Sequence, residues 1–189
     1  MTTATITRHA APEVAAEEDR RFAELLSSLT PTDWSIPTEL PGWDVKAVAS
    51  HVLGEAESYR VREALHQVRA GRKHAHGRAL VDGMNDVQVA DRAHLTPDEI
   101  LVRLHAAAPK FRRFRARMPA PLRAARIANP PYGWLRVGHL LDVVYTRDRW
   151  MHRIDICRAT GRPFGVDAQQ DRLIVADVVA EWAATHRQP

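Results

Sequence analysis

Apolar residues recur at helical intervals along almost the whole chain of 189 residues, and no segment alternates between apolar and polar residues as a half-buried strand does. We therefore predict an all-α fold. Long helices joined by both short and long connections are typical of a four-helix bundle with additional short and C-terminal helices. The predicted helices span residues 12–29, 45–70, 80–93, 97–118, about 134–160, and 166–186.

Local start and stop signals support two of these helices. Thr96 is a good N-cap, Pro97 suits the first helical position, and Glu99 can close a capping box with Thr96. Gly161 supplies a left-handed C-cap, and Pro163 prevents the helix from continuing. These two residues therefore predict that a helix ends at residue 160.

The chain length allows one domain with a substantial core, and we expect a single domain over residues 12–189. Residues 1–11 are small and polar, so they are predicted to be a disordered tail. Residues 119–131 contain four prolines and form the longest predicted irregular connection, which is a candidate lid or crossover.

Cys157 is the only cysteine, which excludes an internal disulfide and a cysteine-rich zinc site. We interpret it as a buried, unreactive thiol. No run of 18 apolar residues is present, and the first 12 residues lack a basic start followed by an apolar stretch, so neither a membrane span nor a signal peptide is indicated. A cytoplasmic location is expected, and any metal must be bound by histidine and carboxylate.

The sequence carries 27 basic and 23 acidic residues, and the basic excess is concentrated in residues 100–147. A basic face is predicted there. One hypothesis is that residues 110–117 bind nucleic acid, with Phe111 and Phe114 as stacking platforms. The spacing of these phenylalanines fits a buried stripe instead, and no recognised nucleic-acid-binding motif is present, so we do not favour it.

Asp148 and His152 are four residues apart, which places them one turn apart on the same face of a helix, with Asp155 half a turn further on. A carboxylate and an imidazole at this spacing can hold one divalent cation, although a surface pair is a common alternative. His51 lies two turns inside another predicted helix, where a packed or solvated histidine is the alternative to a ligand. In a bundle, the three side chains could meet in the core.

Three segments resemble one known family. They are Trp34-x-x-Pro37-Thr38-x-x-Pro41-Gly42-Trp43-x-Val45-x-x-Val48-x-x-His51, Val81-Asp82-x-Met84-Asn85-x-x-Gln88, and Arg147-Asp148-x-Trp150-Met151-His152-Arg153-x-Asp155-Ile156-x-x-Ala159-x-Gly161-Arg162-Pro163. Together they resemble the N-terminal metal-binding domain of mycothiol-dependent maleylpyruvate isomerases, which is a DinB-like four-helix bundle. The resemblance covers about residues 22–163.

This resemblance implies a divalent metal, typically zinc, held by His51, Asp148 and His152. It also implies mycothiol, or a similar low-molecular-weight thiol, as cofactor. Asp148 stands where the isomerases usually have glutamate, and those enzymes carry a further C-terminal domain that contributes to their active site.

Three protein ligands leave coordination positions open, as in catalytic metal sites. The expected activity is that of a transferase or isomerase-like enzyme in which a metal-held thiolate adds to a small electrophilic substrate. Asp155 and Arg147 are candidates for supporting the ligands or binding substrate; a salt bridge of Asp155 with Arg158 or Arg162, and a solvated Arg147, are the alternatives. A module that binds metal or ligand without catalysis is the second hypothesis, and a homodimer is left open.

Overall fold

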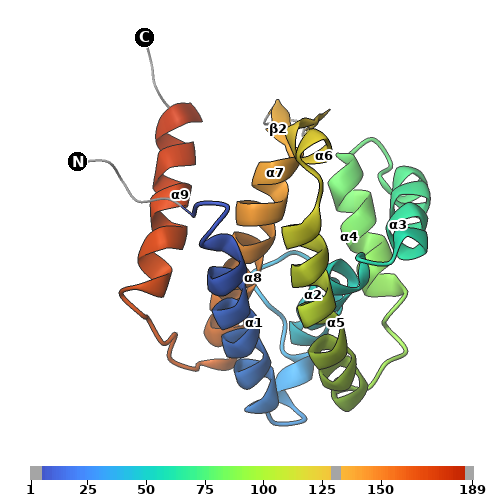
Figure 1. The fold of residues 1–189 in the computed structure, drawn as a ribbon. Helices are drawn as coiled ribbons and strands as arrows, with labels where there is room; N and C mark the ends of the chain where they lie inside the picture. Colours follow the sequence, from blue (N-terminus) through green and yellow to red (C-terminus); the bar gives the residue numbers. More distant parts are fainter. Residues whose placement is uncertain (1–5, 129–132, 186–189) are drawn as a thin grey trace.

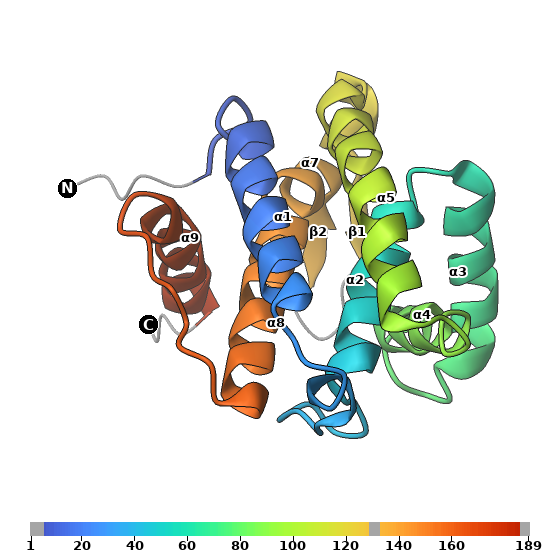
Figure 2. The same cartoon turned by 90° about the horizontal axis from the view of Figure 1, so that it is seen from below.

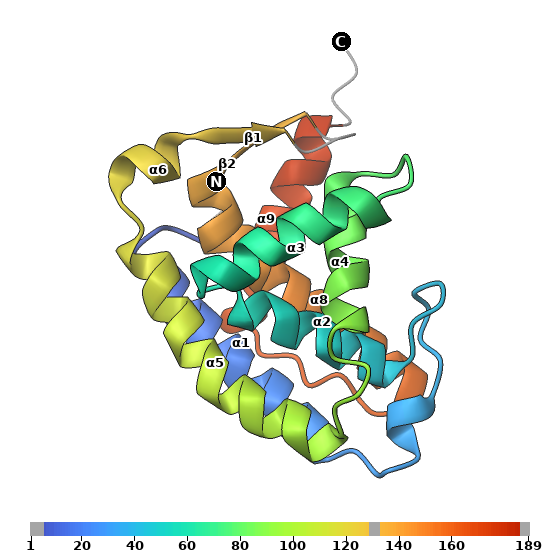
Figure 3. The ribbon, with the colours of Figure 1, turned by 90° about the vertical axis from the view of Figure 1, so that its right-hand side faces the viewer.

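The computed structural model describes residues 6–128 and 133–185, and four of its helices form the bundle that carries the core. Helix α1 (Ala11–Ser27) packs against α5 (Pro97–Arg117) and α8 (Tyr145–Thr160), and α2 (Val45–Glu57) packs against the same two helices. Figure 3 shows α5 in front of α1, with α2 beside them and α8 behind α2. The all-α, DinB-like bundle predicted from the sequence is confirmed.

The core is formed by the apolar stripes of these helices. Phe22 and Leu26 of α1 meet Val48 and Val52 of α2 in one buried cluster, and the same cluster includes Ile100 of α5. Trp34, in the 3₁₀ turn η1 (Asp33–Ser35), is also buried there. Burial of such apolar surface is the main force that holds helices of this kind together.

Three further helices flank the bundle on opposite sides (Figures 1 and 2). On one side, α3 (Val61–His74) pairs with α4 (Leu80–Ala90), and α4 also contacts α2. On the other side lies α9 (Gln170–Thr185), where Ile174 joins Ile6, Val14 and Val143 in a second buried cluster. None of the helices in the described ranges combines the length and apolar character needed to cross a bilayer.

The local termination signals act as predicted. The Thr96 hydroxyl accepts a hydrogen bond from the Glu99 backbone N–H, and the Glu99 carboxylate accepts one from the Thr96 backbone N–H. Gly161 adopts a left-handed conformation with φ of 66°, and its N–H bonds the carbonyl of Arg158. Both helix ends therefore have the predicted caps.

The prediction of one continuous helix over residues 45–70 is wrong, because the helical structure is interrupted between α2 and α3. The Ser58 hydroxyl donates to the carbonyl of Glu55, and Arg60 is extended. A serine that bonds its own backbone in this way competes with helix continuation. The break lets α3 turn back and lie against α4.

The prediction that residues 119–131 form an irregular connection is also wrong over most of this range. Helix α6 (Ala120–Ala124) is followed by β1 (Arg126–Ala128), which pairs antiparallel with β2 (Trp134–Arg136). Residues 129–131 of this prediction lie outside the described ranges. Strands of three residues are too short to display an alternating pattern, so periodicity could not have revealed them.

A short helix α7 (Val137–His139) and a π-helical segment η2 (Leu140–Val144) connect β2 to α8. The start of α8 therefore differs from the predicted continuous helix. At the N-terminus, residues 6–11 do not form the predicted disordered tail, because Ile6 is buried and its N–H donates to Asp177 on α9 at 2.8 Å. Residues 1–5 lie outside the described ranges.

Candidate metal centre

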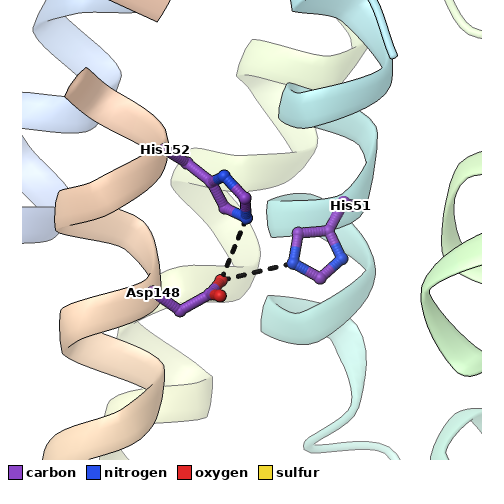
Figure 4. A group of neighbouring side chains, drawn as sticks. All are labelled: His51, Asp148 and His152. Atoms are coloured by element: carbon purple, nitrogen blue, oxygen red, sulfur yellow. Dashed lines mark hydrogen bonds and ion pairs between the residues drawn. The ribbon is translucent and has the colours of Figure 1, made fainter. Parts of the chain in front are cut away.

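The three predicted ligands lie together between two helices of the bundle (Figure 4). His51 projects from the middle of α2, and Asp148 and His152 project toward it from consecutive turns of α8. His51 is 97 residues away from Asp148 in sequence, so this meeting depends on the packing of α2 against α8. Asp44 fixes the start of α2 by accepting a hydrogen bond from the Ala47 N–H.

The distances suit one small cation. Asp148 Oδ2 is 3.2 Å from His51 Nε2 and 3.4 Å from His152 Nε2, and the three donor atoms lie within 4.8 Å of one another. Ligands at about 2.0–2.1 Å from a tetrahedral zinc ion are about 3.3 Å apart. Two imidazole nitrogens and a carboxylate oxygen also form a donor set that zinc accepts.

Both imidazoles are oriented by a hydrogen bond on their other nitrogen. His152 Nδ1 donates to Asp155 Oδ2 at 3.0 Å. His51 Nδ1 is 2.7 Å from Gln88 Oε1. In each ring Nε2 is therefore directed toward Asp148, the arrangement found for metal-binding histidines that have an outer acceptor.

The orientation of the Gln88 amide follows from its own neighbours. Gln67 donates from Nε2 to the carbonyl of Gly54 and to Glu63, so its Oε1 must act as the acceptor for Gln88 Nε2. The oxygen of Gln88 then faces His51, whose Nδ1 must carry the proton. This chain of buried amides links the candidate ligand to α3 and α4.

The electrostatics of the three side chains favour a positive charge between them. Burial disfavours the charged imidazole of His152, but Asp148 and Asp155 outweigh it and raise the pKa of His152 to about 10. Burial also opposes ionisation of Asp148, yet His152 and His51 lower the pKa of this carboxyl below its ordinary value. The carboxylate is therefore held ionised beside two imidazoles.

Glu55 is a site residue that the sequence reasoning missed. Its Oε1 lies 3.9 Å from His51 Nε2, and its buried Oε2 has no hydrogen-bond partner among the described residues. Burial, followed by the negative charge of Asp148, raises the pKa of Glu55. The signal was present in the sequence, because Glu55 follows His51 by four residues and so lies on the same helix face.

Trp43 is a second missed residue. Its ring centroid lies 5.2 Å from that of His51 and 6.2 Å from that of His152, so the indole borders both imidazoles. The loop that carries Trp43 is joined to the start of α2 by the Pro37–Asp44 bridge and by the hydrogen bond from Val45 N–H to the Ile36 carbonyl. The motif that contains Trp43 was recognised, but not this position beside the imidazoles.

Asp155 and Arg147, the two residues proposed from the sequence to support the ligands or bind substrate, have different partners in the structure. Asp155 bonds His152, whereas Arg147 forms an ion pair with Glu181 of α9. The alternative salt bridges of Asp155 are not formed, because Arg158 pairs with Glu39 and Arg162 pairs with Asp33. Asp155 is thus placed to orient a ligand.

Three other residues named in the sequence analysis, Arg153, Cys157 and Phe111, are buried in the protein. Arg153 is buried and pairs with Glu18, and Cys157 is buried with its Sγ 3.8 Å from the carbonyl of Pro163. Burial raises the pKa of the Cys157 thiol, in keeping with an unreactive cysteine. Phe111 is buried in the bundle, so it is not exposed for stacking on a base.

Comparison with known proteins agrees with this fold. The sequence model of a family described as "Mycothiol maleylpyruvate isomerase N-terminal domain" matches residues 15–157. A crystal structure of the mycothiol-dependent maleylpyruvate isomerase has a similar fold, with a TM-score of 0.63 and 14% identity over 95% of this chain and 72% of that one. A point mutant of that enzyme gives a TM-score of 0.63 and 12% identity over 96% and 73% of the two chains. No curated protein sequence gives a significant match.

Proposed function

Because the chain belongs to the mycothiol maleylpyruvate isomerase N-terminal domain family, we propose that it is a metal-dependent enzyme that uses a mycothiol-type thiol on a small electrophilic substrate. His51, Asp148 and His152 bind the divalent metal, for which zinc is the best candidate. The reaction class is a thiol-dependent transfer or isomerisation.

The observation that carries this proposal is the shared direction of two imidazoles. Both Nε2 atoms face the same oxygen of Asp148, while both Nδ1 atoms are hydrogen-bonded elsewhere. With its Nδ1 bound as a donor, a neutral histidine presents a lone pair on Nε2. Two lone pairs and a carboxylate repel one another unless a positive charge lies between them. A proton on His152, whose pKa is raised to about 10, supplies that charge in the metal-free protein, and a divalent cation that displaces this proton would supply it in the metal-bound one.

The chain's own residues would prepare and protect such a site. Gln88 and Asp155 hold the two imidazoles in the tautomer that binds metal, and Trp43 shields their faces from water. When bound, the cation supplies the positive charge that keeps a coordinated thiol sulfur deprotonated at neutral pH. Arg147, paired with Glu181, has no role in this proposal.

The first test is the metal content of the purified protein. We expect about one equivalent of zinc in the wild-type protein and loss of most of it in His51→Ala and Asp148→Asn. The matched control is His66→Ala, because His66 and Asp91 form another histidine–carboxylate pair, at 2.8 Å on the exposed surface. Undiminished metal in the first two variants would show that the ligands are misassigned.

The second test separates an enzyme from a binding module. Zinc-loaded protein is incubated with mycothiol and small electrophiles such as maleylpyruvate, and consumption of the electrophile is followed. We expect turnover that is lost in Asp148→Asn and kept in His66→Ala. Stable metal binding without any thiol-dependent turnover would favour a module without catalysis.

A further inference from the structure

A cavity of about 360 Å³ lies away from the three candidate ligands, between the N-terminal end of α1, the C-terminal end of α5, α6 and η2. Figure 1 shows these ends of α1 and α5 at the same end of the bundle, beside α6. The charged and titratable residues that line the cavity are Arg8, His9, Arg112, Arg115, Arg123 and Asp142.

The positive charge of the lining is only partly neutralised. Arg123 pairs with Asp142, and Arg112 pairs with Asp19, a carboxylate that also pairs with Arg149. Neither Arg8 nor Arg115 forms an ion pair with a carboxylate of the described residues. Four arginines therefore line the cavity together with a single lining carboxylate.

Arg115 is the unusual member of this group, because only 4% of it is exposed. Its guanidinium donates to the Leu141 carbonyl and to Thr146 Oγ1, and lies over the rings of Phe111 and Tyr145. Its Nη1 is buried without a hydrogen-bond partner among the described residues. Burial lowers the pKa of Arg115 to about 10. Glu55 and Asp142 act on Arg115 electrostatically but form no ion pair with it, so an anion that meets its free Nη1 would be stabilising.

The first turn of α1 adds to the positive potential. Ala11, Pro12 and Ala15 of this 17-residue helix line the cavity, so the N-terminal end of the helix dipole is directed to it. The first backbone N–H groups of α1 are already hydrogen-bonded to Thr7 and Ala10, so the helix contributes its dipole only, and the arginine forks are the groups that would bind an oxyanion such as carboxylate or phosphate.

We propose that this arginine-lined cavity binds the oxyanion group, carboxylate or phosphate, of a small molecule. None of the three candidate metal ligands lines this cavity, and the proposal does not depend on the proposed enzymatic activity. Arg115 and Arg8 supply guanidinium groups that form no ion pair with a described carboxylate, and Arg8 is exposed, so a ligand can reach it from solvent.

The test is calorimetric titration of metal-free protein with inorganic phosphate and, separately, with succinate, at low ionic strength. Removal of metal prevents an anion from binding through a cation at His51 and Asp148. We expect saturable binding of at least one probe, and the tighter probe identifies the oxyanion class. Arg8→Glu should weaken binding about tenfold, because it replaces an attractive charge by a repulsive one.

The matched control is Arg72→Glu, which changes the net charge equally at an exposed arginine of α3 that does not line the cavity. It should leave the affinity within about twofold, since exposed charges at a distance are screened. Arg115→Lys, which keeps the charge but removes the planar fork, should weaken binding severalfold. The proposal is overturned if neither probe binds at millimolar concentration, or if Arg8→Glu and Arg72→Glu weaken binding equally.

Discussion

The orientation of His51 depends on an amide that is 37 residues away in sequence. Gln88 can present either its oxygen or its nitrogen to the imidazole, and the bond to Gln67 decides in favour of the oxygen. Gln88 is 4% exposed, so water cannot readily replace it as the acceptor. We therefore regard Gln88 as a positioning residue for the candidate ligand rather than as a ligand.

Replacing Gln88 by methionine removes the acceptor while keeping the side-chain length. We expect the zinc affinity to fall about 10- to 100-fold, the range typical for loss of an outer hydrogen bond to a metal-binding histidine. Competition with a chromophoric chelator measures this. Asn85→Met is the control, because Asn85 is an amide on the same helix without a hydrogen bond to the candidate ligands. Equal affinities for the two variants would contradict the role given to Gln88.

At the scale of elements, the position of α4 depends on two glycines where it crosses α3. A Cβ built on Gly83 would lie 2.1 Å from the carbonyl oxygen of Gly71 and 2.7 Å from the backbone nitrogen of Ala75. A Cβ on Gly71 would lie 2.7 Å from Met84 Cγ. Because the contacts of Gly83 are to backbone, the two helices must separate to accept a side chain. Since α4 carries Gln88, this contact also bears on the metal centre.

Gly83→Ala tests this close approach. Helix propensity alone would add about 1 kcal/mol to the free energy of unfolding. We expect a net loss of about 2 kcal/mol instead, because the steric conflict with backbone exceeds that gain. Urea denaturation measures the change. Gly165→Ala, where nothing lies within 4 Å of the added Cβ, should be neutral or slightly stabilising. A stabilised Gly83→Ala would mean that α3 and α4 are not in such close contact.

At the scale of the whole molecule, a cation bound at this site would join two helices that are far apart in sequence. His51 and Asp148 are separated by 97 positions and lie on α2 and α8, which both border the main core. A ligand that binds only the folded chain stabilises it by mass action. The metal is therefore expected to act on stability as well as on chemistry.

Zinc should raise the melting temperature, and above Kd the rise should follow the logarithm of the free zinc concentration. At a free concentration of about 100 times Kd, the gain is about 2.7 kcal/mol, which corresponds to roughly 5–10 °C for a chain of this size. Scanning calorimetry with and without a chelator measures it. Asp148→Asn should lose most of the shift, and His66→Ala should keep it. An equal shift in all three proteins would place the zinc elsewhere.

The sequence determined the features that depend on neighbouring residues. The caps at Thr96 and Gly161 could be predicted because they use groups a few positions apart, and the common face of Asp148 and His152 follows from the helical repeat. The family resemblance added His51 to this pair. Location in the cytoplasm, oligomeric state and the extent of the domain stay predictions.

Only the tertiary structure decided which distant groups meet. Helix periodicity gives the face of a residue but not the partner helix, so the contacts of His51 with Gln88 and of Arg147 with Glu181 could not be read from spacing. The three-residue strands have too few positions to show a period. They are held by hydrogen bonds between the backbone groups of β1 and those of β2, which no side-chain pattern reveals. Arg115 looked like part of a solvated basic face, but the packing of α5 against η2 buries it, and burial is a property of the whole arrangement rather than of a sequence segment.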